Sequence, residues 1–336
     1  MTRSGSPDLD PVIPTDLLWT PEDDGLHAVG SPKRDWTETT WWSFNVPGRD
    51  LAGWLYIQIR PNLGISTGGA FVYDPSGTTA WNIPYYGYTT FTALPDPLDL
   101  RDVAFGNGVS VRCLEPGLRY ELGYRFRDQD DFVADLLFEG VTRPVPLLPG
   151  EPPFTGSSHY DQTGHVTGTL QLHGETIPVD CFAVRDRSWG RRPELLGRRT
   201  GDRIGYAFGT VSSREAFLVF TAPPADDPAG DVEHLTGGWL LRDGSLRRLR
   251  SAERRVLRDP ATGFPQELTI EGVDGDGRRM RAVGRARSRF ALQSSSLCVN
   301  TFVSWDLDGH LGHGEDQDVW SIARMSERLR AGRVRG

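Results

Sequence analysis

The sequence is poor in cysteine, in lysine and in long apolar stretches. Its three cysteines, Cys113, Cys181 and Cys298, lie far apart and form no C-x-x-C pair, which argues against a disulfide framework and a thiolate zinc site. Lys33 is the only lysine, so arginine carries nearly all of the positive charge. No apolar run approaches the roughly 18 residues that a membrane helix needs, so we expect no membrane-spanning segment.

Sequence motifs for nucleotide binding and for acyl-enzyme chemistry are also missing. No G-x-G-x-x-G opens a helix after a strand, and there is no P-loop and no G-x-S-x-G elbow. The net charge of −8 gives a field that repels nucleic acid. We therefore predict no cofactor, no metal and no nucleic-acid partner. Residues 1–24 lack the apolar core of a secretory signal, which predicts a cytoplasmic location.

Short runs of alternating apolar and polar residues dominate the chain. Within 118–127 every even position up to 126 is apolar and the odd positions are charged or glycine, which is typical of a strand with one buried face. Similar runs occur at 51–60, 69–74, 109–114, 132–138, 205–210, 216–221, 237–241, 267–271 and 298–307. Because Gly, Asp and Pro turns separate them, the pattern predicts an all-β protein of antiparallel sandwiches or barrels.

The length of 336 residues and one proline-dense segment predict two domains. Residues 143–156 contain too many prolines for a central strand or a helix and suit a stiff connection. We therefore predict an N-terminal β domain over 1–145, a linker over 146–157 and a C-terminal β domain over 158–336. The spacing of Val319, Ile322, Ala323 and Leu329 predicts one short C-terminal helix over 318–330.

The most informative segment is 181–192, where an apolar run ends in Asp186, Trp189 and several arginines. Apolar surroundings raise the pKa of a carboxyl group and neighbouring arginines lower it. Asp186 is therefore either a general acid beside an aromatic wall formed by Trp189, or a member of an ion pair with Arg185 or Arg187.

Two further groups of residues are candidates for substrate binding. Trp81, Tyr85, Tyr86 and Tyr88 fall in one turn-flanked stretch, and Trp41 precedes them. Aromatic rings at this density line pockets for polyenes and polyketides, although the same rings can fill a barrel core.

The second group opens the predicted C-terminal domain. His159 is a candidate proton shuttle, with Tyr160 and Gln162 as candidate donors to a substrate oxygen, or the group caps a strand edge.

Two charged regions suggest no separate site. His310, His313, Glu315, Asp316 and Asp318 follow no standard metal spacing, and the glycines among them indicate a solvated turn. The arginine pairs within 242–289 alternate with acids between strand-like runs. This pattern favours a solvated sheet face.

Several of these segments together resemble the carotenoid 1,2-hydratase (hydroxyneurosporene synthase) and AttH-like superfamily. The second half carries His159-Tyr160-Asp161-Gln162, the strand pair 164–172 and 176–183, and Arg185-Asp186-Arg187-Ser188-Trp189-Gly190. Arg187 stands where such proteins often have histidine. The first half carries Trp41-Trp42-Ser43-Phe44, the strand 51–60, Pro61-Asn62 and the strand 70–74. The resemblance implies two tandem lipocalin-like (calycin-like) β-barrels or sandwiches.

The resemblance also implies a cofactor-independent enzyme of hydrophobic secondary metabolism. The expected reaction is acid-assisted hydration or cyclisation of a polyene, terpenoid or polyketide-like substrate, with Asp186, His159 and Tyr160 as catalytic residues. Trp189, Trp41, Trp81, Tyr85, Tyr86, Tyr88 and Gln162 are the expected substrate-binding residues. Two alternatives stay open, a pericyclic (Diels–Alder type) cyclase that acts by shape and a non-catalytic lipid or pigment carrier. The sequence leaves the oligomeric state open.

Overall fold

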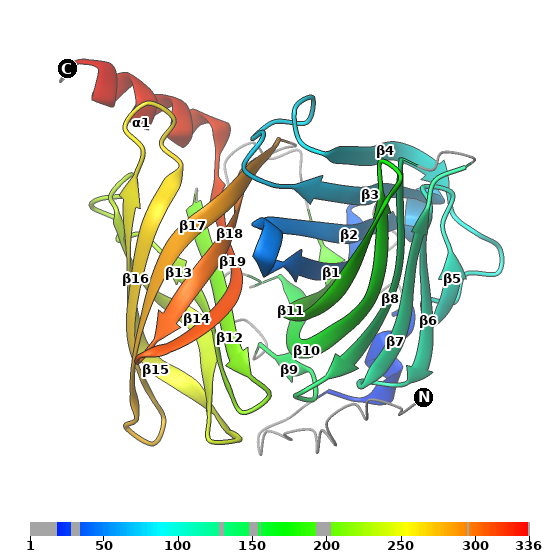
Figure 1. Ribbon diagram of the computed structural model, residues 1–336, viewed down its shortest axis with the longest axis horizontal. Coiled ribbons are helices and arrows are strands. Elements are labelled where there is room, and N and C mark those ends of the chain that lie inside the picture. Colours follow the sequence, from blue (N-terminus) through cyan, green and yellow to red (C-terminus); the bar gives the residue numbers. More distant parts are fainter. Residues whose placement is uncertain are drawn as a thin grey trace.

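The computed structural model describes residues 19–27, 34–127, 131–147, 154, 156–192, 203–293 and 296–334, without the side chains of 332–334. Most of these residues lie in strands, and the strands form two units that stand side by side (Figure 1). The predicted all-β class, with one short C-terminal helix, is thereby confirmed. No helix in the described ranges is long and apolar enough to cross a membrane.

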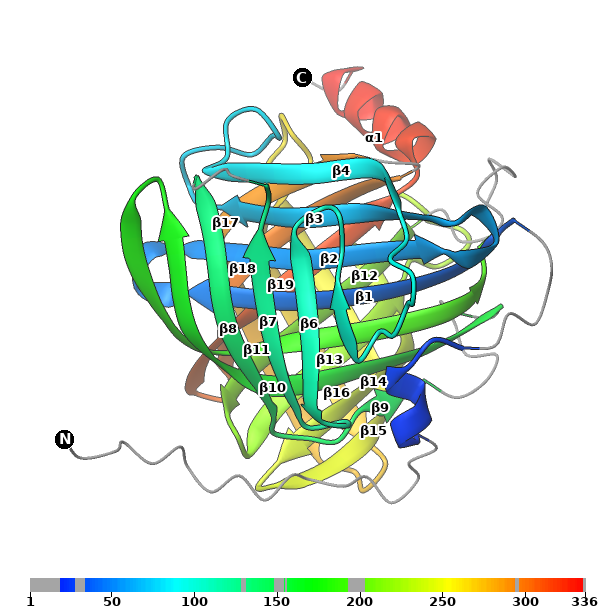
Figure 2. The same ribbon diagram turned by 90° about the vertical axis from the view of Figure 1, so that its right-hand side faces the viewer.

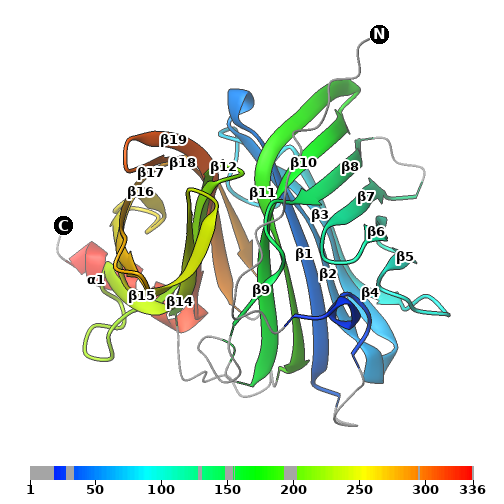
Figure 3. The ribbon, with the colours of Figure 1, turned by 90° about the horizontal axis from the view of Figure 1, so that it is seen from below.

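The N-terminal unit is a curved sheet of eleven strands in the order β4-β3-β2-β1-β11-β10-β8-β7-β6-β5, with β9 paired to β10. Figure 3 shows that the sheet bends into a half-barrel, so that β1–β4 and β5–β8 form facing walls. Its strands are β1 (Trp36–Val46), β2 (Leu51–Arg60), β3 (Ile65–Tyr73), β4 (Tyr85–Ala93), β5 (Asp102–Ala104), β6 (Val109–Glu115), β7 (Arg119–Arg125), β8 (Phe132–Gly140), β9 (Val145–Pro146), β10 (Ser157–Leu172) and β11 (Glu175–Arg191). Short 3-10 helices lie at η1 (Pro21–Asp24), η2 (Pro47–Arg49) and η3 (Pro61–Leu63).

The C-terminal unit is a closed barrel of eight antiparallel strands in sequence order. The strands are β12 (Arg203–Ser212), β13 (Glu215–Ala222), β14 (Val232–Arg242), β15 (Ser245–Arg258), β16 (Pro265–Asp274), β17 (Arg279–Gln293), β18 (Leu297–Leu307) and β19 (His310–Trp320). The helix α1 (Ile322–Val334) follows and lies across one end of the barrel (Figures 1 and 2). The helix predicted over 318–330 therefore starts four positions too early, because β19 continues to Trp320.

The break between the two sheets does not coincide with the predicted linker over 146–157. β9 begins one residue before that segment and β10 begins at its last residue, Ser157, and both belong to the N-terminal sheet. β10 pairs with β8 and with β11, and β11 pairs with β1. The change from one sheet to the other therefore falls between Arg191 and Arg203, well after the prolines.

Alternation along the strands divides the apolar residues among three main cores. In β7, Tyr120, Leu122 and Tyr124 are buried while Arg119 and Arg125 are exposed, as the period of two predicts. One core fills the concave side of the half-barrel, a second lies between the convex side and the barrel, and a third fills the barrel. β1 contributes to two of them, since Trp42 faces the half-barrel interior and Trp41 faces the barrel.

The interior of the barrel also contains a buried ionic network. Arg254 binds Asp316 at 2.7 Å and Glu233 at 2.8 Å, and Arg203 lies 4.0 Å from the Trp320 ring centre. Arg258 pairs with Asp318 in the same network. The solvated face predicted for the arginine-rich region is therefore wrong for Arg254 and Arg258, because the even-numbered positions of β15 from 252 to 258 point into the barrel.

Candidate functional site

The β10–β11 hairpin forms the wall between the two units and carries polar residues on both of its faces. Asp161 of β10 lies opposite Asp186 of β11, which in turn lies opposite Trp41 of β1. Two positions along the hairpin, His159 lies opposite Ser188. Because strand residues alternate between faces, Asp161, Asp186 and Trp41 share the convex face that packs against the barrel.

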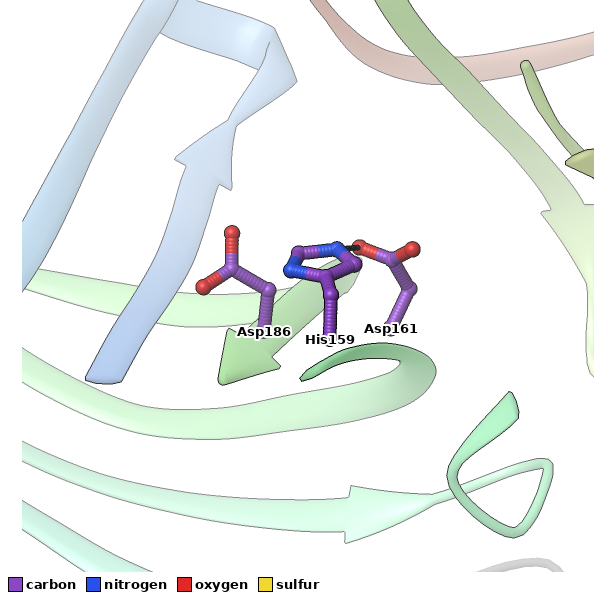
Figure 4. A group of neighbouring side chains, drawn as sticks. All are labelled: His159, Asp161 and Asp186. Atoms are coloured by element: carbon purple, nitrogen blue, oxygen red, sulfur yellow. Dashed lines mark hydrogen bonds and ion pairs between the residues drawn. The ribbon is translucent and has the colours of Figure 1, made fainter. Parts of the chain in front are cut away.

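His159 is fixed between two carboxyl groups on this face. Its Nε2 lies 3.1 Å from Asp161 Oδ1, and the hydroxyl of Tyr206 donates to the same oxygen at 2.7 Å. The other ring nitrogen, Nδ1, is buried without a hydrogen-bond partner among the described residues. Figure 4 shows that this nitrogen faces the Asp186 carboxyl group, and one donor atom from each of the three residues lies within 4.8 Å of the others.

The tautomer of His159 follows from these contacts. Since ionised Asp161 can only accept hydrogen bonds, Nε2 carries the proton in the neutral ring and Nδ1 keeps a free lone pair. A ring nitrogen with a free lone pair can accept a hydrogen bond or a proton from a neighbouring group.

Aromatic rings enclose the site. Phe154 stacks on the His159 ring at a centroid distance of 4.0 Å, and Phe220 contacts it edge-on at 5.5 Å. Tyr206 stacks on Phe220 at 4.6 Å, and Trp41 meets Tyr206 at 6.1 Å. The rings come from both units, so the site exists only where the half-barrel and the barrel meet.

The apolar surroundings change the acidity of Asp186. Burial raises the pKa of its carboxyl group to about 7, and the charge of Asp161 adds to the rise, while His159 and Arg192 oppose it. The Asp186 side chain is partly buried, whereas His159 and Asp161 are fully buried. A carboxyl group with a pKa near neutrality can donate a proton at physiological pH and take it back afterwards.

The same three donors can also hold a cation. One imidazole nitrogen and two carboxylates within 4.8 Å of one another are acceptable ligands for a divalent ion. The sequence-based expectation that no metal takes part therefore stays a prediction. Acid–base catalysis without a metal would survive treatment with EDTA, whereas catalysis by a bound divalent ion would not.

The concave face of the hairpin carries a second polar cluster. Arg185 binds Asp24 at 3.1 Å and Gln162 at 2.5 Å, and its guanidinium lies 4.2 Å from the Tyr120 ring centre. Tyr160 also donates to Asp24, at 3.0 Å. All of these side chains are buried, and a cavity beside Arg185 of about 10 Å³ holds no more than about one water.

Sequence reasoning therefore joined residues that the structure separates. Tyr160 and Gln162 lie on the concave face with Arg185, away from Asp186. Trp189 lies on that face too, where it stacks on His27 at 3.7 Å and meets Tyr160 edge-on. The expected Trp189 wall beside Asp186 does not form, because an odd spacing of three residues places two side chains on opposite faces of a strand.

The aromatic stretch of the first unit is divided in the same way. Tyr85 faces the half-barrel core, where its hydroxyl lies 2.8 Å from that of Tyr124. Tyr86 and Tyr88 stack on Phe71 on the convex face, and Trp81 is 84% exposed in a turn. Of the predicted substrate-binding residues, Trp41 therefore lies next to Asp186 in the register, and Tyr86 and Tyr88 share its face farther along the sheet.

Other residues at the interface were not singled out from the sequence. Tyr206 completes the hydrogen bonds of Asp161, and Glu315 accepts a hydrogen bond from Trp54 Nε1 at 2.8 Å across the two units. Burial raises the pKa of Glu315 to about 8. The alternation within β12 and β19 indicates that Tyr206 and Glu315 point outward from the barrel. These outward faces are buried only because the two units pack against each other.

The acidic run near the C-terminus is a strand and not a solvated turn. Glu315 faces the N-terminal unit, while Asp316 and Asp318 point into the barrel and bind arginines. His310 is exposed and pairs with Glu215 at 2.8 Å. Within the part of the chain that the structure describes, these side chains do not converge on one point.

Two solved structures resemble this chain in fold. Among solved structures, an AttH-like protein from Nitrosomonas europaea matches with a TM-score of 0.55 and 17% identity over 92% of this chain and 98% of that one. Kievitone hydratase from Nectria haematococca matches with a TM-score of 0.52 and 13% identity over 84% of this chain and 89% of that one. These likenesses show the fold, and they confirm the AttH-like part of the resemblance at that level.

The family of the chain follows from comparison of its sequence. No curated protein sequence matches the chain. A family model described as a domain of unknown function, DUF7064, matches residues 20–316. The match covers most of the chain, so the protein belongs to the DUF7064 family.

Proposed function

We propose that this protein is a hydratase-type enzyme that adds water to an alkene of a hydrophobic substrate, with Asp186 as general acid and His159 as general base. One observation carries the proposal: the buried Nδ1 of His159 has no described partner and faces Asp186 across a short gap, while Asp161 holds the opposite side of the ring. The likeness to kievitone hydratase fits a hydration enzyme in broad terms.

The reaction follows from the two proton states. Protonated Asp186 gives its proton to one alkene carbon, and the oxygen of a water molecule forms a bond to the other carbon. The water loses a proton to Nδ1 of His159, and Asp161 stabilises the imidazolium that results. Asp186 is then a carboxylate and His159 is an imidazolium, and proton transfer across the gap restores both groups.

The surroundings favour an apolar substrate. Phe154, Phe220 and Trp41 present rings around the acid and the base, and such rings bind conjugated or polycyclic bodies. A positive charge that develops on the substrate would be stabilised by the face of a neighbouring ring. A polyene, a terpenoid or a polyketide-like alkene has these properties, and no cofactor is needed for the cycle.

Nothing in the geometry favours the two alternatives over hydration. A carrier would need an open apolar cavity, whereas the described part of the barrel interior contains apolar side chains and the ionic network around Arg254. A cyclase that acts by shape would not require an Asp-His-Asp arrangement. The acid, the base and the orienting carboxylate therefore support hydration best.

Isotope-labelled water tests the proposal directly. The purified protein is incubated with conjugated alkenes of the polyene and polyketide types in water enriched in oxygen-18. Mass spectrometry should show products that gain one labelled water, and Asp186→Asn should form them at about a hundredth of the wild-type rate or less. Cyclised products without added water would support the shape-driven cyclase. Tight binding with no product in any protein would support the carrier.

A further inference from the structure

Four arginines follow one another closely in the last part of β11 and directly after it, and three of them have a carboxylate partner. Arg185 pairs with Asp24, Arg187 with Glu38 at 2.8 Å, and Arg191 with Asp35 at 2.8 Å. Arg192 is the exception, since its guanidinium contacts no carboxylate within the described ranges. Its side chain is half-buried, where an unpaired positive charge costs free energy.

The position of Arg192 links it to the proposed site. Its backbone N–H donates to Asp35 O at 2.8 Å, and its guanidinium donates to the hydroxyl of Ser188. Ser188 lies opposite His159 in the register, on the face that carries Asp186. The charge of Arg192 lies near enough to lower the pKa of Asp186 against the effect of burial.

A short chain of hydroxyl groups extends from this guanidinium. Ser188 and Thr39 place their hydroxyl oxygens 2.7 Å apart, and both residues are buried. The contact with Ser188 uses one terminal nitrogen of Arg192, and no described residue accepts a hydrogen bond from the other donors of the planar fork. An arginine fork of this kind recognises a carboxylate through two parallel hydrogen bonds.

We infer that Arg192 binds a carboxylate of the substrate, so that the substrate is an unsaturated acid with an apolar body. This inference rests on the proposed function and adds the substrate class to it. The carboxylate lies at Arg192 and Ser188, and the apolar body extends over Asp186 and His159 towards the rings of Phe154 and Phe220. Binding one end of the substrate in this way fixes which alkene carbon meets the acid.

Binding of a matched pair of fluorescent polyenes tests the inference. The probes are cis-parinaric acid and its methyl ester, which share a conjugated apolar body and differ in the negative charge. Dissociation constants are measured at about pH 8, where a carboxylic acid is ionised. Wild-type protein, Arg192→Gln and the control Arg191→Gln are compared. Arg191 is adjacent, and its exposed guanidinium binds Asp35, so the control removes a neighbouring charge away from the site.

The wild type should bind the acid at least about tenfold more tightly than the ester, as a charge-assisted bidentate pair predicts. Arg192→Gln should lose most of this preference through weaker acid binding and bind the ester as before, while Arg191→Gln keeps the preference. A wild type without preference, or a preference that survives in Arg192→Gln, overturns the inference. Melting temperatures of all three proteins show whether each variant is folded.

The same measurements separate this inference from the proposed function. A preference that depends on Arg192, without water addition to any alkene, would contradict the hydratase and leave the carboxylate site in place. Water addition to neutral alkenes, with equal binding of the two probes, would contradict the carboxylate site and leave the hydratase in place.

Discussion

Arg185 and Asp186 are adjacent in the sequence, but their side chains lie on opposite faces of β11 and belong to separate clusters. Arg185 binds Asp24 inside the half-barrel, and Asp186 faces His159 and the barrel. Arg187 likewise points to the concave face, where it binds Glu38. The ion pair that the sequence offered as the alternative role of Asp186 is therefore not formed with either neighbour.

Replacing Asp186 by Asn should remove the acid and preserve the fold. Asn keeps the size of the side chain but cannot supply a carboxyl proton, so turnover should fall about a hundredfold or more while probe binding and melting temperature stay close to wild type. Steady-state kinetics and thermal melts check both parts. Asp180→Asn, an exposed position of the same strand, is the control. Full turnover in Asp186→Asn would exclude the acid mechanism.

Asp161 should act through His159. Asp161→Asn removes the carboxylate that accepts the Nε2 proton and stabilises the imidazolium, so turnover should fall about a hundredfold. Tyr206→Phe removes only the second hydrogen bond to Asp161 and should cost much less. The turnover numbers of the two variants test the order. Equal losses of turnover in the two variants would mean that the Asp161 carboxylate contributes to packing and does not assist His159 as a base.

Turnover should depend on pH through Asp186. Burial raises the pKa of this carboxyl group to about 7, and the proposed reaction uses the protonated form. The turnover number for hydration should therefore fall as pH rises through about 7, by about tenfold for each further pH unit. A pH series of initial rates at saturating substrate measures this limb. A turnover number that is constant between about pH 6 and 9 contradicts the assignment.

Glu315 should make stability depend on pH. Burial raises its pKa from 4.5 to about 8, so the stability that the neutral carboxyl contributes is complete below about pH 4.5 and is lost as pH rises through about 8. Glu315→Gln should melt close to wild type near pH 5 and at least about 2 °C higher near pH 9. Melting temperatures across this range test it, with the exposed Glu327→Gln as control. Parallel curves for wild type and Glu315→Gln would show that Glu315 does not titrate in this way.

Removal of metal ions should leave the reaction intact. The proposed cycle needs only Asp186, His159 and Asp161, so dialysis against EDTA should change turnover by less than about twofold. Metal analysis of the dialysed protein accompanies the assay. Loss of turnover that one divalent ion restores would instead assign His159, Asp161 and Asp186 as metal ligands.

Local patterns predicted most of the strands and the two central residues of the site. Alternation is a property of each strand alone, so runs such as 118–127 could be recognised without knowing their partners. Asp186 stood out because it ends an apolar run. His159 stood out because it opens the predicted C-terminal domain. The alternation could also have separated Trp189 from Asp186, since an odd spacing on one strand is visible in the sequence.

Long-range pairing could not be derived from these patterns. The prolines between 144 and 153 indicate a connection, but they carry no information about which sheet the following strand joins. β10 and β11 return to β8 and β1, and the second of these pairings joins residues at opposite ends of the N-terminal unit. Tyr206 and Glu315 became buried only through packing of the two units, and a single strand cannot reveal that.

The two-sided use of β11 has a consequence for how the protein can evolve. Deletion of Arg185 would slip the register and exchange the faces of the residues that follow, sending Arg187 to the barrel side and Asp186 into the half-barrel core. Both clusters would be lost together. Descendants of this chain can therefore alter the site by replacing residues, while changes in length are confined to the turns, such as the one at His173 and Gly174 that joins β10 to β11.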